Sequence, residues 1–260
     1  MEITTKEEIS WCPGCTNFFI KKSVEDALKN LIAEGYKQEE FVMVTDIGCA
    51  GKMYDYLNIS GINALHGRTL PTMIGIKIGN PHLKVIGFAG DGGTYDEGMD
   101  HFIHSCRYNN DMNLIVHNNQ VFALTVGQAT AVSQIGFKEK THPFGVKERP
   151  INPIVLALES GATFVARANS LDIQGTKEII QDGIKHRGFS FIEIMQPCIT
   201  FFDNREILKK NSYKISTMNK EDAIKEAKKW NYEDNGKIPI GIFYKENRET
   251  FEDNYDILKI

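Results

Sequence analysis

The sequence predicts an α/β fold in which a mostly parallel sheet carries helices on both of its faces. Two observations predict it. Short apolar runs typical of buried strands alternate with longer segments of helical periodicity. Such alternation favours parallel pairing, because each helix returns the chain to the start of the next strand. Glycine, aspartate, asparagine and cysteine residues directly follow several strands, at the edge where open parallel sheets bind ligands.

The first half of the chain supplies three strands and three helices. Residues 16–34 are expected to form an amphipathic helix, since Ile20, Val24 and Leu28 recur at helical spacing and Gly35 follows. The apolar runs 41–46, 83–90 and 112–118 are interpreted as buried strands, and residues 69–80 and 95–109 as helices between them.

The second half begins with an expected loop over residues 124–150, which contain several glycines and prolines. We then expect helices at 152–160 and 172–187, strands at 162–167 and 189–195, and an edge or tail strand at 238–244. Residues 1–205 are predicted to form one α/β domain. Residues 206–260 are predicted to be a C-terminal extension that packs on this domain or on a partner subunit.

The composition is that of an ordinary globular protein. Of 260 residues, 42% are hydrophobic and 25% are charged, and the net charge is −4, which argues against general affinity for nucleic acid or for anionic membranes. No apolar run approaches the roughly 20 residues of a membrane span. The N-terminus is polar and acidic, unlike a secretory signal, so we expect a cytoplasmic location.

Two motifs after neighbouring strands predict a site for Mg²⁺ and a diphosphate. In the run Gly90-Asp91-Gly92-Gly93, the glycines permit close approach to an anion and Asp91 offers a hard oxygen. By itself this run would be an ordinary strand-to-helix turn. Asn118-Asn119 follows the next strand, and a neutral amide oxygen also suits Mg²⁺. The expected protein ligands are Asp91, Asn119 and the backbone carbonyl of Val121.

Four cysteines are placed so that they could converge. Cys12 and Cys15 have the spacing of a chelating turn, while Cys49 and Cys198 each follow a strand at the ligand-binding edge. Four thiolates suit either zinc or an iron–sulfur cluster, and their chemistry alone slightly favours structural zinc. A redox dithiol at Cys12 and Cys15 is a minor alternative. Cys106 lies within a predicted helix and is interpreted as a packing residue.

Together these motifs resemble a known family. The stretches "WCPGCTNF" (11–18), "GCAGK" (48–52), "LHGRTLPTMIGIKIGNP" (65–81), "LTVGQA" (124–129) and "QPC" (196–198) resemble the β subunit of 2-oxoacid:ferredoxin oxidoreductases. The resemblance covers roughly residues 10–203. The chain departs from the family pattern at Thr16, where glycine is usual, and also at Ala123 and Thr130.

The resemblance implies a thiamine diphosphate-binding fold and a set of site residues. It implies thiamine diphosphate and Mg²⁺, with coenzyme A as a co-substrate, and it favours a [4Fe–4S] cluster on Cys12, Cys15, Cys49 and Cys198. It implies that His66 faces the cofactor and that Arg68 helps to bind the oxoacid, both as catalytic residues. Lys52, three residues after Cys49, is a third catalytic candidate that could bind a substrate carboxylate, and the alternative is a solvated lysine at a helix start. The implied cofactor-binding residues are Ile47, Gly48, Cys49, Ala50, His66, Gly90, Gly92, Gly93, Ala123, Leu124 and Thr125.

The implied reaction is oxidative decarboxylation of a 2-oxoacid to acyl-CoA and CO₂, with electrons passing through the cluster to ferredoxin. The resemblance also implies an α subunit that supplies an activating glutamate and part of the substrate pocket, so the chain is expected to be inactive alone. Further subunits are compatible with it. A non-oxidative decarboxylase half would have no use for four thiols. A zinc-stapled assembly subunit would leave Asp91 and Asn119 without a purpose.

Overall fold

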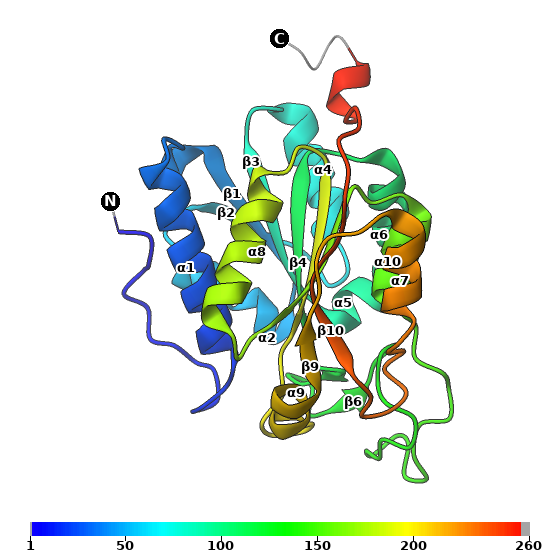
Figure 1. Ribbon diagram of the computed structural model, residues 1–260. Coiled ribbons are helices and arrows are strands. Elements are labelled where there is room, and N and C mark those ends of the chain that lie inside the picture. Colours follow the sequence, from blue (N-terminus) through cyan, green and yellow to red (C-terminus); the bar gives the residue numbers. More distant parts are fainter. Residues whose placement is uncertain (1, 256–260) are drawn as a thin grey trace.

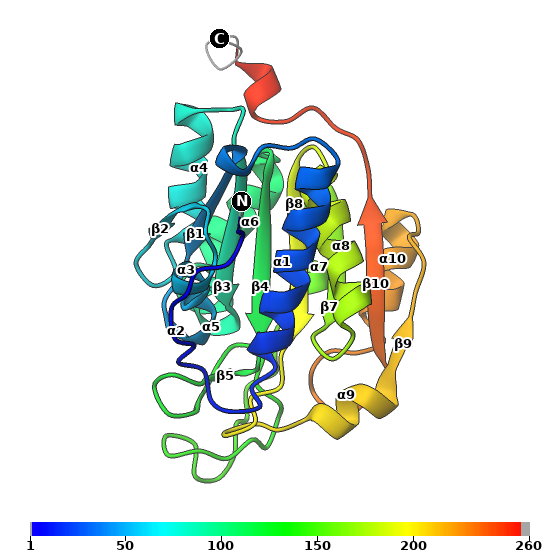
Figure 2. The ribbon, with the colours of Figure 1, turned by 90° about the vertical axis from the view of Figure 1, so that its left-hand side faces the viewer.

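The computed structural model describes residues 2–255 and confirms the expected mostly parallel sheet with helices on both faces (Figures 1 and 2). The strands of its main sheet are β1 (Phe41–Thr45), β2 (Ser60–Asn63), β3 (Lys84–Gly90), β4 (Met112–Asn118), β7 (Phe164–Asn169), β8 (Phe189–Met195), β9 (Ser212–Lys214) and β10 (Ile238–Lys245). They lie in the order β2-β1-β3-β4-β8-β7-β10-β9. Neighbours from β2 to β7 pair in parallel, whereas β10 is antiparallel to β7.

Two layers of helices cover the sheet. The helices are α1 (Asn17–Ala33), α2 (Gly48–Gly51), α3 (Met53–Tyr56), α4 (Thr69–Gly79), α5 (Asp91–Tyr95), α6 (Met99–Tyr108), α7 (Pro153–Ser160), α8 (Ile173–Lys185), α9 (Arg205–Asn211) and α10 (Lys220–Ala227), with short 3₁₀ turns at Gln38–Glu40 and Glu252–Asn254. In Figure 1, α1 and α8 lie on one side of the sheet, and α6, α7 and α10 on the other. No helix within residues 2–255 is long and apolar enough to cross a bilayer.

Each face of the sheet has its own core, because successive side chains of a strand point to opposite faces. On β3, Ile86 and Phe88 pack in the cluster that includes α1 and α8, whereas Val85 and Ala89 pack in the cluster that includes α6 and α7. Every residue of β4 is buried, as expected for a central parallel strand. The strand ends are therefore held between two packed layers.

The helix predicted over 95–109 is wrong at its start. The chain instead forms α5, a break at residues 96–98, and then α6. At the break, the backbone N–H groups of Asp96 and Glu97 both donate to the Gly92 carbonyl. Gly98 lies against the backbone, and a Cβ there would come within 2.8 Å of the Gly93 carbonyl oxygen. A Cβ at Gly98 would also lie 2.9 Å from the Gly67 carbonyl oxygen, so the chain after α5 passes close to the Gly67 backbone.

The strand predicted at 238–244 is not at the edge. It is β10, which lies between β7 and β9 and runs opposite to β4 in Figure 2. Segments after residue 205 contribute buried side chains to the core on the α7 face, among them Leu208, Ala223 and Phe243. The loop expected over 124–150 also contains part of a small hairpin, in which β6 (Gln128–Ala129) pairs with β5 (Val121–Phe122).

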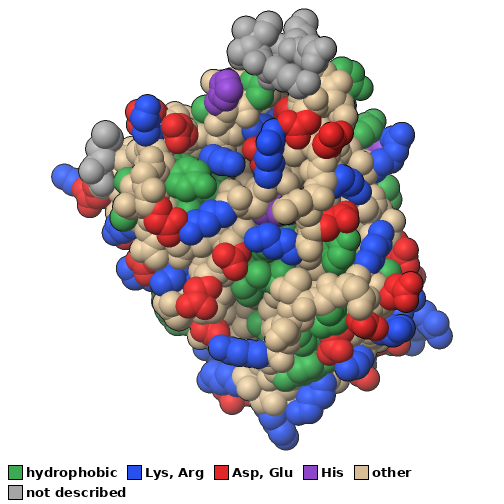
Figure 3. Space-filling view, turned by 45° about the horizontal axis from the view of Figure 1, so that its top comes forward, with side chains coloured by type: hydrophobic (Ala, Val, Ile, Leu, Met, Phe, Trp, Pro, Cys, Tyr) green, Lys and Arg blue, Asp and Glu red, His purple; other side chains and the backbone are tan. Residues whose placement is uncertain are grey.

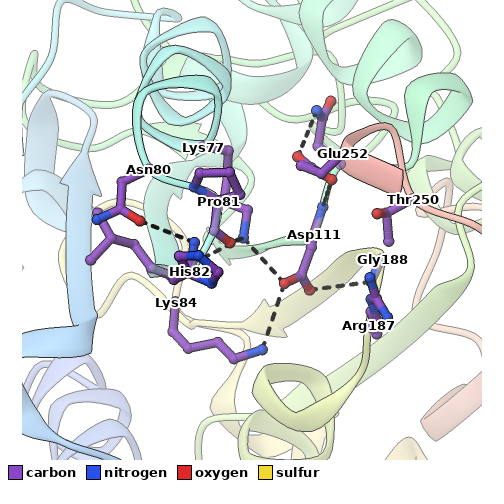
Figure 4. Close-up of polar contacts among 12 residues, drawn as sticks. Lys77, Asn80, Pro81, His82, Lys84, Asp111, Arg187, Gly188, Thr250 and Glu252 are labelled. Atoms are coloured by element: carbon purple, nitrogen blue, oxygen red, sulfur yellow. Dashed lines mark hydrogen bonds and ion pairs between the residues drawn. The ribbon is translucent and has the colours of Figure 1, made fainter. Parts of the chain in front are cut away.

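The amino ends of the strands are closed by a polar cluster (Figure 4). The buried Lys77 ammonium donates to the carbonyls of Pro81 and Leu83 and to Asp111 Oδ2, which also pairs with Lys84. Glu252 accepts from the backbone N–H of Asp111. The C-terminal segment is thus tied to the start of β4. Acidic and basic side chains are interspersed over the face seen in Figure 3.

Candidate active site

The carboxyl ends of β1, β3, β4 and β8 meet at one edge, the lower edge in Figures 1 and 2. Two cavities open there. The first, of about 160 Å³, is lined by the residues that follow β1, β3 and β4, and we call it the diphosphate cavity. The second, of about 280 Å³, is lined by the N-terminal segment and by residues that follow β1 and β8, and we call it the thiol cavity.

Asp91 is the buried carboxylate of the diphosphate cavity. Burial raises the pKa of Asp91 to about 7, although hydrogen bonds from the Thr130 hydroxyl (2.7 Å, to Oδ2) and the Asn119 backbone N–H (3.3 Å, to Oδ1) oppose the rise. The described residues give Asp91 hydrogen-bond donors but no cationic partner. A buried carboxylate without a counter-charge fits a bound cation, which would favour its ionised form.

A left-handed residue shapes the turn that follows β4. Gln120 has φ +64°, which is uncommon outside glycine. Its backbone N–H donates to Asn118 Oδ1 over 3.1 Å, and its side-chain Nε2 donates to the Val132 carbonyl over 2.8 Å. In this turn the Asn119 amide oxygen accepts a hydrogen bond from the Val121 N–H over 3.1 Å. Asp91, Asn119 and Val121 all line the same cavity, as the Mg²⁺ prediction requires.

Two glycines leave open space along the wall of this cavity. Gly48 has φ +88°, and neither Gly48 nor Gly90 has any atom within 4 Å of the place where a Cβ would stand. Both line the cavity, so their missing side chains leave space for a ligand. Gly93 differs, because a Cβ there would lie 1.6 Å from Asp46 Oδ2. A cradle of open glycines beside short helices suits a diphosphate.

The four predicted cysteine ligands come together at the thiol cavity, which all four line. A tight turn at Gly14 (φ +82°) brings the Cys15 N–H to the Cys12 carbonyl over 3.0 Å. Trp11 Nε1 donates to the Cys49 carbonyl over 2.8 Å, fixing the N-terminal segment beside α2. Burial, helped by the three other thiols and opposed by a hydrogen bond from the Asn17 backbone, raises the pKa of Cys15 to about 11.

The fifth cysteine, Cys106, is fully buried within the α6 face, as expected of a packing residue. Among residues 2–255, no three His, Cys, Asp or Glu side chains lie close enough together to hold a single metal ion. The four thiols nevertheless line one cavity, and three of them lie near enough to Cys15 to raise its pKa. Burial raises the pKa of Cys49, although the charge of Lys52, which lies beside the thiols, opposes the rise.

The two cavities share a wall. Cys49, Asn119, Ala123 and Leu124 line both of them. The remaining predicted cofactor-binding residues line the diphosphate cavity, namely Ile47, Gly48, Ala50, His66, Gly90, Gly92, Gly93 and Thr125. The structure thus brings both sets of predicted residues to one place.

The three predicted catalytic residues lie in different surroundings. His66 lines the diphosphate cavity, with Nε2 4.0 Å from Asp46 Oδ2 and Nδ1 3.9 Å from Glu97 Oε1. Lys52 lines the thiol cavity instead, and its ammonium donates to the Ser10 carbonyl over 3.0 Å. Arg68 lines neither cavity and donates to the carbonyls of Gly67 and Glu97. Their roles stay predictions.

Several polar residues of the site were missed by the motif analysis. Thr130 bonds Asp91, Gln120 shapes the turn after β4, and Asp46 accepts the Gly67 N–H over 3.0 Å while fully buried. The side-chain amide of Gln196 accepts a hydrogen bond from Asn119 Nδ2 and donates one to Cys15 Sγ. Two of these residues could have been found from the sequence. Thr130 departs from the family pattern, and Gln196 immediately follows a strand at the ligand-binding edge.

Comparisons with known proteins agree with this geometry. Residues 46–194 match the model of the thiamine pyrophosphate enzyme C-terminal TPP-binding domain. Residues 198–259 match the C-terminal part of the pyruvate ferredoxin oxidoreductase β subunit. The first match spans the diphosphate cavity, and the second begins at Cys198.

Similar proteins span most of the chain. A 2-oxoacid:ferredoxin oxidoreductase subunit β of Saccharolobus solfataricus is 40% identical over 90% of this chain and 81% of its own. The 2-oxoglutarate synthase subunit KorB of Archaeoglobus fulgidus is 37% identical over 73% and 70%.

A solved 2-oxoglutarate:ferredoxin oxidoreductase of Magnetococcus marinus, with 2-oxoglutarate, coenzyme A and succinyl-CoA bound, superimposes with a TM-score of 0.91. It is 28% identical and covers 97% of this chain and 86% of its own. The predicted resemblance and fold class are confirmed. The chain therefore belongs to the β subunits of the 2-oxoacid:ferredoxin oxidoreductase family.

Proposed function

We propose that this β subunit carries thiamine diphosphate, Mg²⁺ and a [4Fe–4S] cluster in a coenzyme A-dependent 2-oxoacid:ferredoxin oxidoreductase. The complex would convert a 2-oxoacid of the pyruvate or 2-oxoglutarate type to acyl-CoA and CO₂ and reduce ferredoxin. The similar protein from Magnetococcus marinus, solved with 2-oxoglutarate and coenzyme A, supports this reaction. The names of the relatives support a 2-oxoacid as substrate.

The observation that carries the proposal is the wall shared by the two cavities. Cys49 and Asn119 face both the diphosphate cavity and the thiol cavity. Electron transfer is favoured when donor and acceptor lie close together. A decarboxylase that released its product without oxidation would need only the first cavity, so the adjoining thiols favour an oxidoreductase.

The residues of the diphosphate cavity have distinct tasks in this proposal. Asp91, the Asn119 amide oxygen and the Val121 carbonyl would hold Mg²⁺, which would in turn bind the diphosphate. Gly48 and Gly90 leave room for close backbone contact with its oxygens. When bound, thiamine diphosphate supplies the carbanion chemistry by which a 2-oxoacid loses CO₂. His66, which follows β2 and lines this cavity, would donate to the cofactor or substrate.

The surroundings of the thiols favour a cluster over zinc. Four cysteines face a cavity that shares a wall with the diphosphate cavity. Zinc has no redox chemistry, whereas an iron–sulfur cluster takes up and releases electrons. Its position beside the diphosphate cavity suits an electron acceptor.

Dependence on an α subunit is part of the proposal. No glutamate is among the residues 2–255 that line either cavity. The carboxylic acid that activates the aminopyrimidine would therefore come from the partner, together with part of the substrate pocket. The exposed Leu124, at 51%, stands at the rim of both cavities and is available to such a partner.

The proposal is tested with the complex assembled anaerobically from this chain and its α subunit. We expect reduction of ferredoxin and formation of acyl-CoA that require a 2-oxoacid, coenzyme A and both subunits together. A panel of pyruvate, 2-oxoglutarate and branched-chain oxoacids would identify the substrate. Release of CO₂ and free aldehyde with no reduction of ferredoxin would contradict the proposal and favour a non-oxidative decarboxylase.

A further inference from the structure

Gln196 joins the two cavities through its side-chain amide. It is the first residue after β8, and its side chain is only 2% exposed. Its Oε1 accepts a hydrogen bond from Asn119 Nδ2 over 3.1 Å. On the other side, its Nε2 faces the Pro197 carbonyl at 3.0 Å, Thr16 Oγ1 at 3.1 Å and Cys15 Sγ at 3.7 Å. One amide therefore contacts a residue of each predicted metal site.

The surroundings of Gln196 fix which way its amide points. A carbonyl oxygen such as that of Pro197 can only accept a hydrogen bond, and so can a cysteine sulfur once it is deprotonated. The end of the amide that faces them must therefore be the N–H₂ group. The Thr16 hydroxyl donates to the Pro197 carbonyl over 3.3 Å, which leaves its oxygen free to accept from Gln196. Three acceptors thus share the two N–H groups and hold the amide nitrogen toward the thiol cavity.

The orientation of Gln196 in turn orients Asn119. Since Gln196 presents its oxygen, Asn119 must present its nitrogen to the shared contact. The Asn119 oxygen then points the other way, where it accepts the Val121 N–H over 3.1 Å. That oxygen is the atom proposed to bind Mg²⁺. If Asn119 were rotated by 180° about its terminal bond, it would offer a donor to the cation, and binding would weaken.

We propose that Gln196 is a positioning residue for both sites: it holds the Asn119 oxygen toward the cation and donates an N–H group to the sulfur of Cys15. The proposal rests on the proposed function, since it concerns the Mg²⁺ and cluster sites named there. Residues that orient metal ligands typically change metal affinity about 10- to 100-fold when replaced. Hydrogen bonds to cluster sulfurs are among the features that set cluster potentials, because they stabilise the more negative, reduced state.

The proposal also gives a role to Thr16, one of the positions at which the chain departs from the family pattern. Its hydroxyl provides one of three acceptors for Gln196, and the residue is only 1% exposed. Replacing Thr16 by valine would keep the volume and remove this acceptor. The Pro197 carbonyl and Cys15 would remain, so the amide would keep its orientation with less support.

The test compares three variants of the assembled complex, Gln196→Met, Thr16→Val and Gln174→Met. Methionine fills a similar volume to glutamine without its polar groups. Gln174 is an exposed residue of α8 that bonds only Glu178 in the described part of the chain, so its variant is the matched control. Two quantities are measured without turnover: the Mg²⁺ concentration needed to retain thiamine diphosphate through gel filtration, and the midpoint potential of the cluster by a redox titration followed by electron paramagnetic resonance.

For Gln196→Met we expect the Mg²⁺ requirement to rise about tenfold or more and the midpoint potential to become more negative, with iron content unchanged. Gln174→Met should match the unaltered complex in both quantities. Thr16→Val should change both in the same directions by less, and it serves as the test if Gln196→Met does not assemble. Wild-type values of either quantity in a folded, iron-loaded Gln196→Met complex would overturn the proposal. Absence of iron from the unaltered complex would instead contradict the proposed function.

Discussion

Arg167 Nε donates to Glu193 Oε2 over 2.8 Å, and both side chains are fully buried. The pair connects distant parts of the chain. Glu193 Oε1 accepts from Asn118 Nδ2 over 2.7 Å, beside the turn that carries Asn119. Tyr232, after α10, donates to the other carboxylate oxygen, and the Arg167 guanidinium lies 5.0 Å from the ring centre of Trp230. The C-terminal segment is thereby tied to the back of the proposed metal site.

Breaking this buried pair should be costly. Glu193→Gln would leave the Arg167 charge buried without a counter-charge, which typically lowers the free energy of unfolding by about 3–5 kcal/mol. Glu206→Gln provides the control, because Glu206 pairs with Lys209 on the surface and is itself 86% exposed. The control should lose less than about 1 kcal/mol. Urea unfolding of the two variants measures the difference, and similar losses would contradict the account.

Removing the Asp91 carboxylate should separate binding from stability. Asp91→Ala is expected to retain no thiamine diphosphate through gel filtration in Mg²⁺, since it deletes a proposed metal ligand. Without cofactor, Asp91→Ala should lose little of the free energy of unfolding of the unaltered chain. The reason is that the carboxylate it removes is buried without a counter-charge, which is itself unfavourable. Asp100→Ala, at an exposed position on α6, should keep the cofactor. Normal thiamine content in Asp91→Ala would refute the metal-site assignment.

Two glycines of the same turn should respond differently to alanine. Gly90 has an extended backbone (φ −85°) and no atom near the place of a Cβ, so Gly90→Ala should leave the unfolding free energy unchanged. Its methyl group would occupy cavity space and weaken thiamine diphosphate binding about tenfold. Gly93→Ala should instead destabilise the fold by about 1–3 kcal/mol, because its Cβ would overlap the Asp46 carboxylate.

Urea unfolding and equilibrium dialysis against the labelled cofactor would measure the two effects. Equal loss of stability in Gly90→Ala and Gly93→Ala would show that the wall at Gly90 is not open.

Stability should also fall as the pH falls, partly through His186. Burial, together with the Lys245 charge and against the smaller opposing effects of Asp111 and Glu246, lowers the pKa of His186 to about 4. Between this value and the usual pKa near 6.5, the unfolded chain binds a proton that the native chain does not. The native state therefore loses about 2 kcal/mol from this group between pH 7.5 and pH 5. Its full contribution is present above the unfolded pKa.

The measurement compares unaltered chain with His186→Gln in urea at several pH values. Other groups with shifted pKa values are common to both proteins, so their effects cancel in the difference between the two curves of unfolding free energy against pH. We expect the curves to converge as the pH falls from 7.5 to 5. Parallel curves over that range would contradict the assignment.

Much of this molecule can be predicted from its sequence, for physical reasons. Strand β3 contains a continuous apolar run, Val85 to Ala89, because both of its faces are covered, and helix α1 shows its periodicity because one side is buried. The metal and thiol residues follow strand ends, and parallel pairing brings those ends to one edge. The short edge strand β2, with exposed Ser60 and Asn63, has no such pattern and was missed.

Contacts between side chains were the other part that the sequence could not supply. Gln196 lies in a recognisable motif, yet nothing in its neighbours along the chain indicates that it reaches both Asn119 and Cys15. The same holds for Thr130 on Asp91 and for the pair of Arg167 with Glu193. Each joins segments that only folding brings together. These contacts can be found only when the positions of the neighbouring strands in space are known, and not from the presence of those strands in the sequence alone.

The central claim is that an iron–sulfur cluster adjoins a thiamine diphosphate site within this chain. Metal, acid-labile sulfide and thiamine analysis of the complex, purified under anaerobic conditions with its α subunit, tests it most directly. We predict iron and sulfide in equal amounts together with thiamine diphosphate and Mg²⁺. The iron should be lost when Cys12, Cys15, Cys49 or Cys198 is replaced by serine and kept in Cys106→Ser. Stoichiometric zinc with no iron on this chain would contradict the account.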